Sequence, residues 1–132
     1  MDAINDRWSL HIVRAVAFGA SRYTDILRAV GAPRDVLSAR LRKLTESGIL
    51  QARSPERGRL AGYELTPKGR DLGVVILVLK NWGDAYRDEG VPTVDFVHTV
   101  CGETFHAQVT CQACRNVIRS GEFSVDGTSS GC

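Results

Sequence analysis

The sequence predicts a mainly α-helical fold with a small β-hairpin, followed by a short β extension rich in cysteine. Three observations predict it. Apolar residues recur at helical spacing over much of the chain, two short strand-like runs flank a loop of arginine, proline and glycine, and three of the four cysteines cluster near the C-terminus. The chain has 132 residues, of which 43% are hydrophobic and 24% charged, as in an ordinary globular protein.

Three short helices are expected at the N-terminal end, separated by tight glycine turns. The first covers 8–16, and the second runs from Thr24, acting as an N-cap, to Gly31. The third starts near Pro33, because the missing N–H of proline costs nothing in a first turn, and runs to Gly48. The apolar faces of these helices are formed by Trp8, Ile12, Ala15 and Val16, by Ile26, Leu27 and Val30, and by Leu37, Leu41 and Leu44.

A hairpin and a long helix are expected next. Strands over 49–54 and 62–66 flank the loop "PERGRLA", which predicts a β-hairpin with a basic tip. Thr66 then acts as an N-cap, and Pro67 occupies the first helical position. The helix that they open is expected to run for about twenty residues toward Glu89.

The long helix has more apolar surface than one small chain can cover. One stripe is formed by Leu72, Val75, Ile76, Leu79, Trp82 and Tyr86. Val74, Leu77 and Val78 add apolar surface elsewhere on the helix. The simplest cover for a second apolar face is the same helix of another copy, so we expect a homodimer.

The charge of the chain is unevenly distributed. Residues 1–70 carry a net charge of +6 and residues 71–132 a net charge of −4, and fourteen of the seventeen basic residues are arginines. Arginine binds phosphates and guanine edges well, because its planar fork of donors matches their acceptors. The basic half can therefore hold a polyanion such as DNA, although a solvated, arginine-rich surface is an alternative interpretation.

The order of these elements is that of a winged helix-turn-helix. The stretches "RWSLHIVRAV", "VLSARLRKL", "SGIL" and "YELTPKGRDL" resemble the HxlR-type family of bacterial transcription regulators, and the resemblance extends roughly from Asp6 to Gly83. Members of that family are dimeric DNA-binding repressors or activators. The resemblance thus implies a homodimeric regulator that binds double-stranded DNA, here on an operator with an inverted repeat.

The sequence departs from the family at two positions. Many relatives carry a cysteine just ahead of the first helix as a redox sensor, but no cysteine precedes Cys101 here. Thiol sensing ahead of the first helix is therefore not expected. Relatives also tend to cap the third helix with serine where this chain has Pro33.

The third helix is the expected recognition helix, because its face opposite the three leucines is free to enter the major groove. Arg42 can bond guanine O6 and N7, and Arg34 can reach a base edge or a phosphate. Ser38 can bond either, Ala39 can touch a thymine methyl, and Asp35 can accept from cytosine N4 or orient an arginine. The alternative is a solvated face of an amphipathic helix.

The hairpin is the expected wing. Arg53, Arg57 and Arg59 lie on or beside its tip, where glycine and proline allow a close approach to phosphates or to the minor groove. An exposed loop whose charges serve solubility is the alternative.

The stretch "HTVCGETFHAQVTCQAC" predicts a metal site. His98 and Cys101, and likewise Cys111 and Cys114, form two pairs with two-residue gaps, and nine residues separate the pairs. This spacing is typical of structural zinc sites with four protein ligands, which leave no open position for chemistry. His106 could replace His98 as the fourth ligand. A thiol-disulfide pair and unpaired thiols are the alternatives.

The predicted organisation is a winged helix-turn-helix domain over 1–90, which includes the long dimerisation helix, and a zinc-ribbon-like tail over 91–132. No signal peptide is visible, and the longest apolar run, 73–79, is too short to span a bilayer, so we expect a cytoplasmic protein without a membrane partner.

An enzyme is not expected, because no nucleophile with its base and no phosphate-binding glycine loop is recognisable. The alternative functions are a thiol-redox protein that uses Cys111 and Cys114, and a zinc-stapled protein-interaction module. The sequence does not indicate the effector, the operator or the regulated genes.

Overall fold

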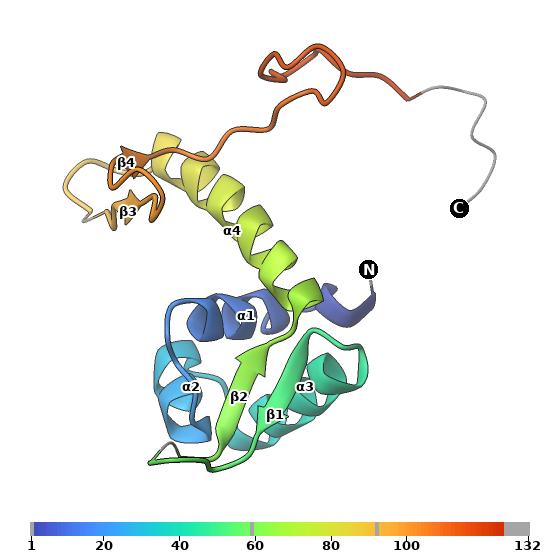
Figure 1. Cartoon of the computed structure of the whole chain (residues 1–132), viewed down its shortest axis with the longest axis vertical. Coiled ribbons are helices and arrows are strands. Elements are labelled where there is room, and N and C mark those ends of the chain that lie inside the picture. Colours follow the sequence, from blue (N-terminus) through green and yellow to red (C-terminus); the bar gives the residue numbers. More distant parts are fainter. Residues whose placement is uncertain (1, 59, 92, 126–132) are drawn as a thin grey trace. The chain divides into compact units, whose positions relative to one another are not determined.

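A computed structural model describes residues 2–58, 60–91 and 93–125 of the chain. Its elements confirm the mainly helical fold with a small antiparallel hairpin (Figure 1). In chain order they are the 3-10 helix η1 (Asp2–Ile4), helices α1 (Ser9–Ala17), α2 (Tyr23–Val30) and α3 (Arg34–Glu46), strands β1 (Leu50–Arg53) and β2 (Gly62–Leu65), helix α4 (Pro67–Ala85), and strands β3 (Phe96–Val97) and β4 (Thr104–Phe105).

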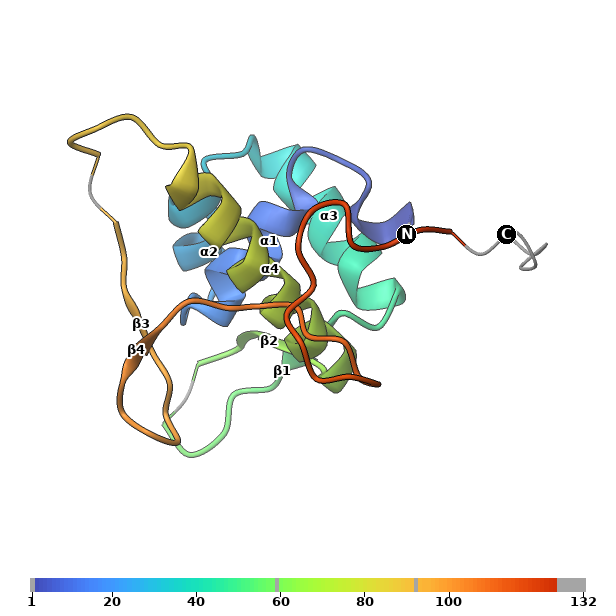
Figure 2. The same cartoon turned by 90° about the horizontal axis from the view of Figure 1, so that it is seen from above.

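The chain divides into two compact units, residues 1–77 and 78–132. The division lies inside α4, earlier in the chain than the boundary at residue 90 that the sequence predicts. In the first unit, α1, α2 and α3 surround one apolar core, and the β1–β2 hairpin lies beside α3 (Figures 1 and 2). The core consists of Ile12, Val13, Ile26, Ala32, Leu37, Leu41, Leu44, Ile49, Leu50 and Ile76.

Asp6 fixes the start of α1. Its carboxylate accepts hydrogen bonds from the backbone N–H groups of Trp8 (2.9 Å) and Ser9 (3.0 Å) and from the Ser9 hydroxyl, which is fully buried. The Arg40 guanidinium on α3 lies 3.6 Å from the same carboxylate. Asp6 therefore binds otherwise unpaired donors at the start of α1 and also joins α1 to α3.

The start of α2 differs from the prediction. Arg22, with extended backbone angles, is the N-cap residue, so the predicted N-cap at Thr24 is wrong, and Thr24 lies inside the first turn. The predicted end of α2 is confirmed, because Gly31 has a left-handed φ of 71°. Helix α3 begins after Pro33, whose carbonyl accepts the first helical bond from Leu37, and no side chain caps it.

The predicted start of α4 is confirmed by the hydrogen bonds of Thr66. Its hydroxyl accepts from the Gly69 N–H at 3.2 Å, and its own N–H donates to the Ile49 carbonyl at 3.1 Å. The predicted length of about twenty residues is confirmed, because α4 has 19 residues, but the helix ends at Ala85 and does not reach Glu89. A longer helix would place the negative charges of Asp88 and Glu89 at its C-terminal end, where the helix dipole is also negative. This repulsion disfavours continuation of the helix to Glu89.

The predicted apolar stripe of α4 has a part that packs on the core and a part that is exposed. Ile76 belongs to the core of the first unit, and Leu72 packs against that core. The other members of the predicted stripe are exposed, by 50% for Val75, 48% for Leu79 and 67% for Trp82 in α4, and by 78% for Tyr86 directly after it. These four residues, which we call the α4 stripe, remain uncovered in the single chain.

The second unit consists of the end of α4 and two short hairpins. Strands β3 and β4 pair antiparallel, and a single bridge joins Thr110 to Val117. Among residues 78–91 and 93–125, no strand pairing joins the two hairpins into one ribbon. Among the described residues, the buried apolar side chains all precede Leu77, so this unit has little core of its own. No helix in the described part of the chain is long and apolar enough to cross a membrane.

Candidate DNA-binding surface

Helix α3 presents a polar face opposite its buried leucines. Leu37, Leu41 and Leu44 are at most 1% exposed, because they face the core. All five residues predicted for the major groove are exposed on α3, namely Arg34, Asp35, Ser38, Ala39 and Arg42. The structure thus brings these side chains together on one helix and leaves them free of the core.

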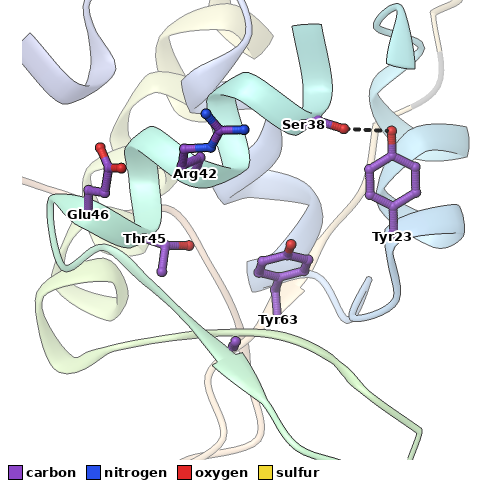
Figure 3. Close-up of a pocket in the computed structure, with 7 residues that line it drawn as sticks. Tyr23, Ser38, Arg42, Thr45, Glu46 and Tyr63 are labelled. Atoms are coloured by element: carbon purple, nitrogen blue, oxygen red, sulfur yellow. Dashed lines mark hydrogen bonds between the residues drawn. The ribbon is translucent and has the colours of Figure 1, made fainter. Parts of the chain in front are cut away.

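Tyr23 on α2 holds the first turns of α3. Its hydroxyl donates to the Arg34 carbonyl at 3.0 Å and lies 3.2 Å from the Ser38 hydroxyl (Figure 3). Tyr23 was not among the residues predicted from the sequence, although it stands at helical spacing before Ile26 and Leu27 and continues their face. Tyr23 therefore orients one of the predicted contact residues, Ser38, and ties the two helices together.

A shallow open pocket of about 420 Å³ lies between α3, the start of α2 and the hairpin (Figure 3). Arg42 supplies its cation, and three hydroxyls besides that of Ser38 line it. The lining residues are Tyr23, Ser38, Arg42, Thr45, Glu46, Ala52 and Tyr63. Such a set can donate several hydrogen bonds to phosphate oxygens or base edges, as polar side chains in DNA interfaces do. In the described part of the chain, no carboxylate pairs with Arg42.

The predicted wing residues differ in their surroundings. Arg53 is half-buried and donates to the Leu60 carbonyl at 3.1 Å, so it braces the loop where it leaves β1. Arg57 is exposed near the tip, where it adopts a left-handed φ of 44° next to Gly58. Arg59 lies outside the described residues. Of the predicted wing residues, Arg57 is thus the one that the structure places on an exposed surface.

The predicted metal ligands form two separate pairs. His98 Nδ1 lies 3.3 Å from Cys101 Sγ, and Cys111 lies next to Cys114 in the second hairpin. Hydrogen bonds from the backbone N–H groups of Cys114 and Ala113 and from the Cys114 thiol lower the pKa of the Cys111 thiol. Within the described ranges, no group of three or more His, Cys, Asp or Glu side chains is placed to hold a metal ion.

The three helices, the hairpin and the exposed polar face of α3 define a winged helix-turn-helix protein. In this class, the second helix of the helix-turn-helix motif enters the major groove of DNA. A model of the HxlR-like helix-turn-helix family matches residues 3–91. The chain therefore belongs to the HxlR-like helix-turn-helix family, a family of transcriptional regulators.

Individual relatives agree with this assignment. The chain is 39% identical over 124 residues to the HTH-type transcriptional regulator Rv3095 of Mycobacterium tuberculosis. The matched region covers 89% of this chain and 76% of the relative. The crystal structure of PA1607, a candidate transcription factor, is similar with a TM-score of 0.81 and 30% identity over 96% of this chain and 89% of the other. The structure of the oxidised redox regulator HypR matches with a TM-score of 0.58 and 27% identity, over 66% of this chain and 92% of HypR.

Proposed function

We propose that this transcriptional regulator acts as a homodimer and binds an operator with an inverted repeat through α3. The main support for this proposal is the exposed guanidinium of Arg42. It stands on the α3 face opposite the leucines, in a pocket whose other polar groups are mostly neutral hydroxyls. Arginine in this position can bond both acceptors of a guanine in the major groove.

The homodimer forms through the α4 stripe. Val75, Leu79 and Trp82 follow one another at spacings of three or four residues, so they line one side of α4. Tyr86 comes directly after the end of the helix, and its ring lies beside that of Trp82, with ring centroids 5.8 Å apart. Four large apolar side chains that are about half or more exposed are costly in water, and a second copy of the same stripe covers them by two-fold symmetry. Two recognition helices then contact half-sites about 34 Å apart, one helical turn of DNA.

The test is a gel-shift titration against the DNA upstream of the chain's own gene, with unrelated duplex as competitor. Arg42→Ala is expected to weaken specific binding by ~1–3 kcal/mol and to relax the preference at one base pair per half-site. Arg14→Ala is the matched control, because Arg14 is an exposed arginine on α1. Equal operator affinity of wild type and Arg42→Ala would exclude this role for α3.

The wing is tested by the salt dependence of binding. Arg57→Ala is expected to weaken binding to every sequence about equally and to reduce the salt slope by about one unit, because a phosphate contact releases counterions. Arg53→Ala is expected to act differently, by loosening the hairpin through loss of its bond to the Leu60 carbonyl. An unchanged slope for Arg57→Ala would show that the wing tip does not touch the backbone.

A thiol-redox role is the second candidate function. It is favoured by the hydrogen bonds that lower the pKa of Cys111 and by the similarity to the redox regulator HypR. A mild thiol oxidant separates the two candidates. Operator binding that changes on oxidation in wild type and not in Cys111→Ser would support the redox role.

A further inference from the structure

The two hairpins of the second unit contain turns with the same backbone geometry. In the first turn (98–103), the His98 N–H donates to the Glu103 carbonyl at 2.8 Å, and the His98 carbonyl accepts from the Gly102 N–H at 2.7 Å. In the second turn (111–116), the residue in the position of His98 is a cysteine. The two turns are separate loops, drawn in orange and red in Figure 2.

The second turn repeats the first bond for bond. The Cys111 N–H donates to the Asn116 carbonyl at 2.8 Å, and the Cys111 carbonyl accepts from the Arg115 N–H at 2.9 Å. The fifth residue of each turn is left-handed, with φ of 77° at Gly102 and 65° at Arg115. Few residues other than glycine adopt such angles, so the same left-handed angle at Arg115 indicates that function constrains the conformation of this turn.

In each turn, the first and fourth side chains face one another. His98 Nδ1 and Cys101 Sγ are 3.3 Å apart, and the Cys111 sulfur accepts from Cys114 and from the Ala113 N–H. In a tetrahedral zinc site, bond lengths of about 2.3 Å to sulfur and 2.0 Å to nitrogen separate two such ligands by about 3.6 Å. Each turn therefore already holds one edge of a metal tetrahedron.

The two turns cannot share a role in disulfide formation, because only the second turn contains two cysteines. Cys111 and Cys114 could form a disulfide, but the matching turn offers His98 in place of the first cysteine. Metal binding is the chemistry that histidine and cysteine share in this geometry. A set of three thiolates and one imidazole is typical of structural zinc.

We propose that His98, Cys101, Cys111 and Cys114 bind one zinc ion, which joins the two turns of a chain into a single ribbon. The thiol protons of the three cysteines are released to solvent as the zinc–sulfur bonds form. Because four protein ligands close the tetrahedron, the ion stabilises the tail and has no open position for catalysis. It supplies stability to a unit that has little core of its own.

The segment between the turns has the right length to bring them together. Residues 106–109, which lie in neither a helix nor a strand, can form a bend of the length that hairpins use. In the proposed ribbon, this bend lies at the end opposite both turns, so Cys101 and Cys111 stand at the same end. His106, midway between them in sequence, then lies at the bend, which favours His98 as the fourth ligand.

The site is tested on the full chain purified under reducing conditions. One zinc per chain is expected, and replacement by Co²⁺ should give the intense absorption of tetrahedral cobalt together with thiolate-to-metal charge-transfer bands. A ratio of one ion per two chains would overturn the proposal, because the ligands would then come from two copies. Absence of bound metal would overturn it as well.

Variants distinguish the ligands from their neighbours. Cys101→Ser, Cys111→Ser and His98→Ala are each expected to weaken zinc binding by more than the roughly 10–100-fold that loss of an outer-shell partner costs. Cys132→Ser and His106→Ala are the matched controls and should keep the metal. Loss of zinc in His106→Ala with retention in His98→Ala would overturn the ligand set.

A thiol count gives a readout that does not depend on the folding of any variant. Of the four cysteines, one is expected to react rapidly with a thiol reagent in the zinc-bound protein, and four after a chelator is added. Rapid reaction of all four before chelation would contradict the proposal. So would a Cys111–Cys114 disulfide in the purified protein, since it favours the redox role.

Discussion

At the scale of single residues, the Asp6 carboxylate accepts hydrogen bonds from Trp8 and Ser9 and lies beside Arg40. Burial alone would raise its pKa, but the hydrogen bonds from Ser9 and from the backbone N–H groups of Trp8 and Ser9, with the charge of Arg40, lower it below the ordinary value of 3.8. The lowered pKa means that the ionised carboxylate stabilises the fold. This contribution is fully present above the pKa of the unfolded chain and is lost as pH falls through the folded value.

Asp6→Ala is therefore expected to lower the free energy of unfolding by ~1–2 kcal/mol at pH 7, because it leaves donors at the start of α1 and the buried Ser9 hydroxyl without a partner. The difference from wild type should shrink as pH falls below about 4, where the wild-type carboxylate becomes protonated. Urea unfolding followed by circular dichroism measures both effects. Asp2→Ala, at an exposed position, is the control, and an equal loss in both variants would contradict this account.

At the scale of elements, two glycines of α4 should respond in opposite directions to the same substitution. A Cβ on Gly69 would lie 2.2 Å from the Ile49 carbonyl oxygen, because the first turn of α4 packs directly on the chain that enters β1. A Cβ on Gly73, one turn later, would meet only the Ala17 methyl at an ordinary 4.0 Å. Neither glycine has a positive φ, so steric contact and helix propensity decide the outcome.

Gly69→Ala is expected to destabilise the first unit by ~1–3 kcal/mol, because backbone must shift to make room. Gly73→Ala should stabilise it by ~0.5–1 kcal/mol through its higher helix propensity. Thermal unfolding of the two variants beside wild type checks the prediction. A stabilised Gly69→Ala variant would mean that α4 does not pack this closely on the start of the hairpin.

At the scale of the whole molecule, the α4 stripe should decide the oligomeric state. Leu79→Arg is expected to raise the dimer dissociation constant more than 100-fold, equivalent to ~3 kcal/mol, because a charge without a partner would be buried at the interface. Sedimentation velocity over a range of concentrations measures this change. Leu60→Arg alters another exposed leucine, 57% exposed in the hairpin loop against 48% for Leu79, and it should leave the mass of the assembly unchanged.

The same experiment separates dimerisation from DNA reading. The Leu79→Arg monomer keeps both the core and the exposed face of α3, so it should retain weak binding to a half-site and lose the preference for an inverted repeat. A wild-type chain that is monomeric at micromolar concentration with α4 intact would refute the dimer.

The sequence by itself determined the three helices, the hairpin, the start of α4 at Thr66 and the side of α3 that stays in water. These features follow from local causes, such as the spacing of Leu37, Leu41 and Leu44, the left-handed preference of Gly31 and the proline at position 67. Membership of the family could also be predicted, because the motifs "VLSARLRKL" and "YELTPKGRDL" lie on these same elements.

The tertiary structure alone decided which side chains meet across elements. The contact of Tyr23 with Ser38, the bond of Arg53 to the Leu60 carbonyl and the ion pair of Arg40 with Asp6 join residues whose spacing along the chain carries no signal of contact. The true start of α2 and end of α4 belong here too, because a helix end depends on small energies that its neighbours supply. Periodicity fixes which face of an element is buried, and packing fixes its partners.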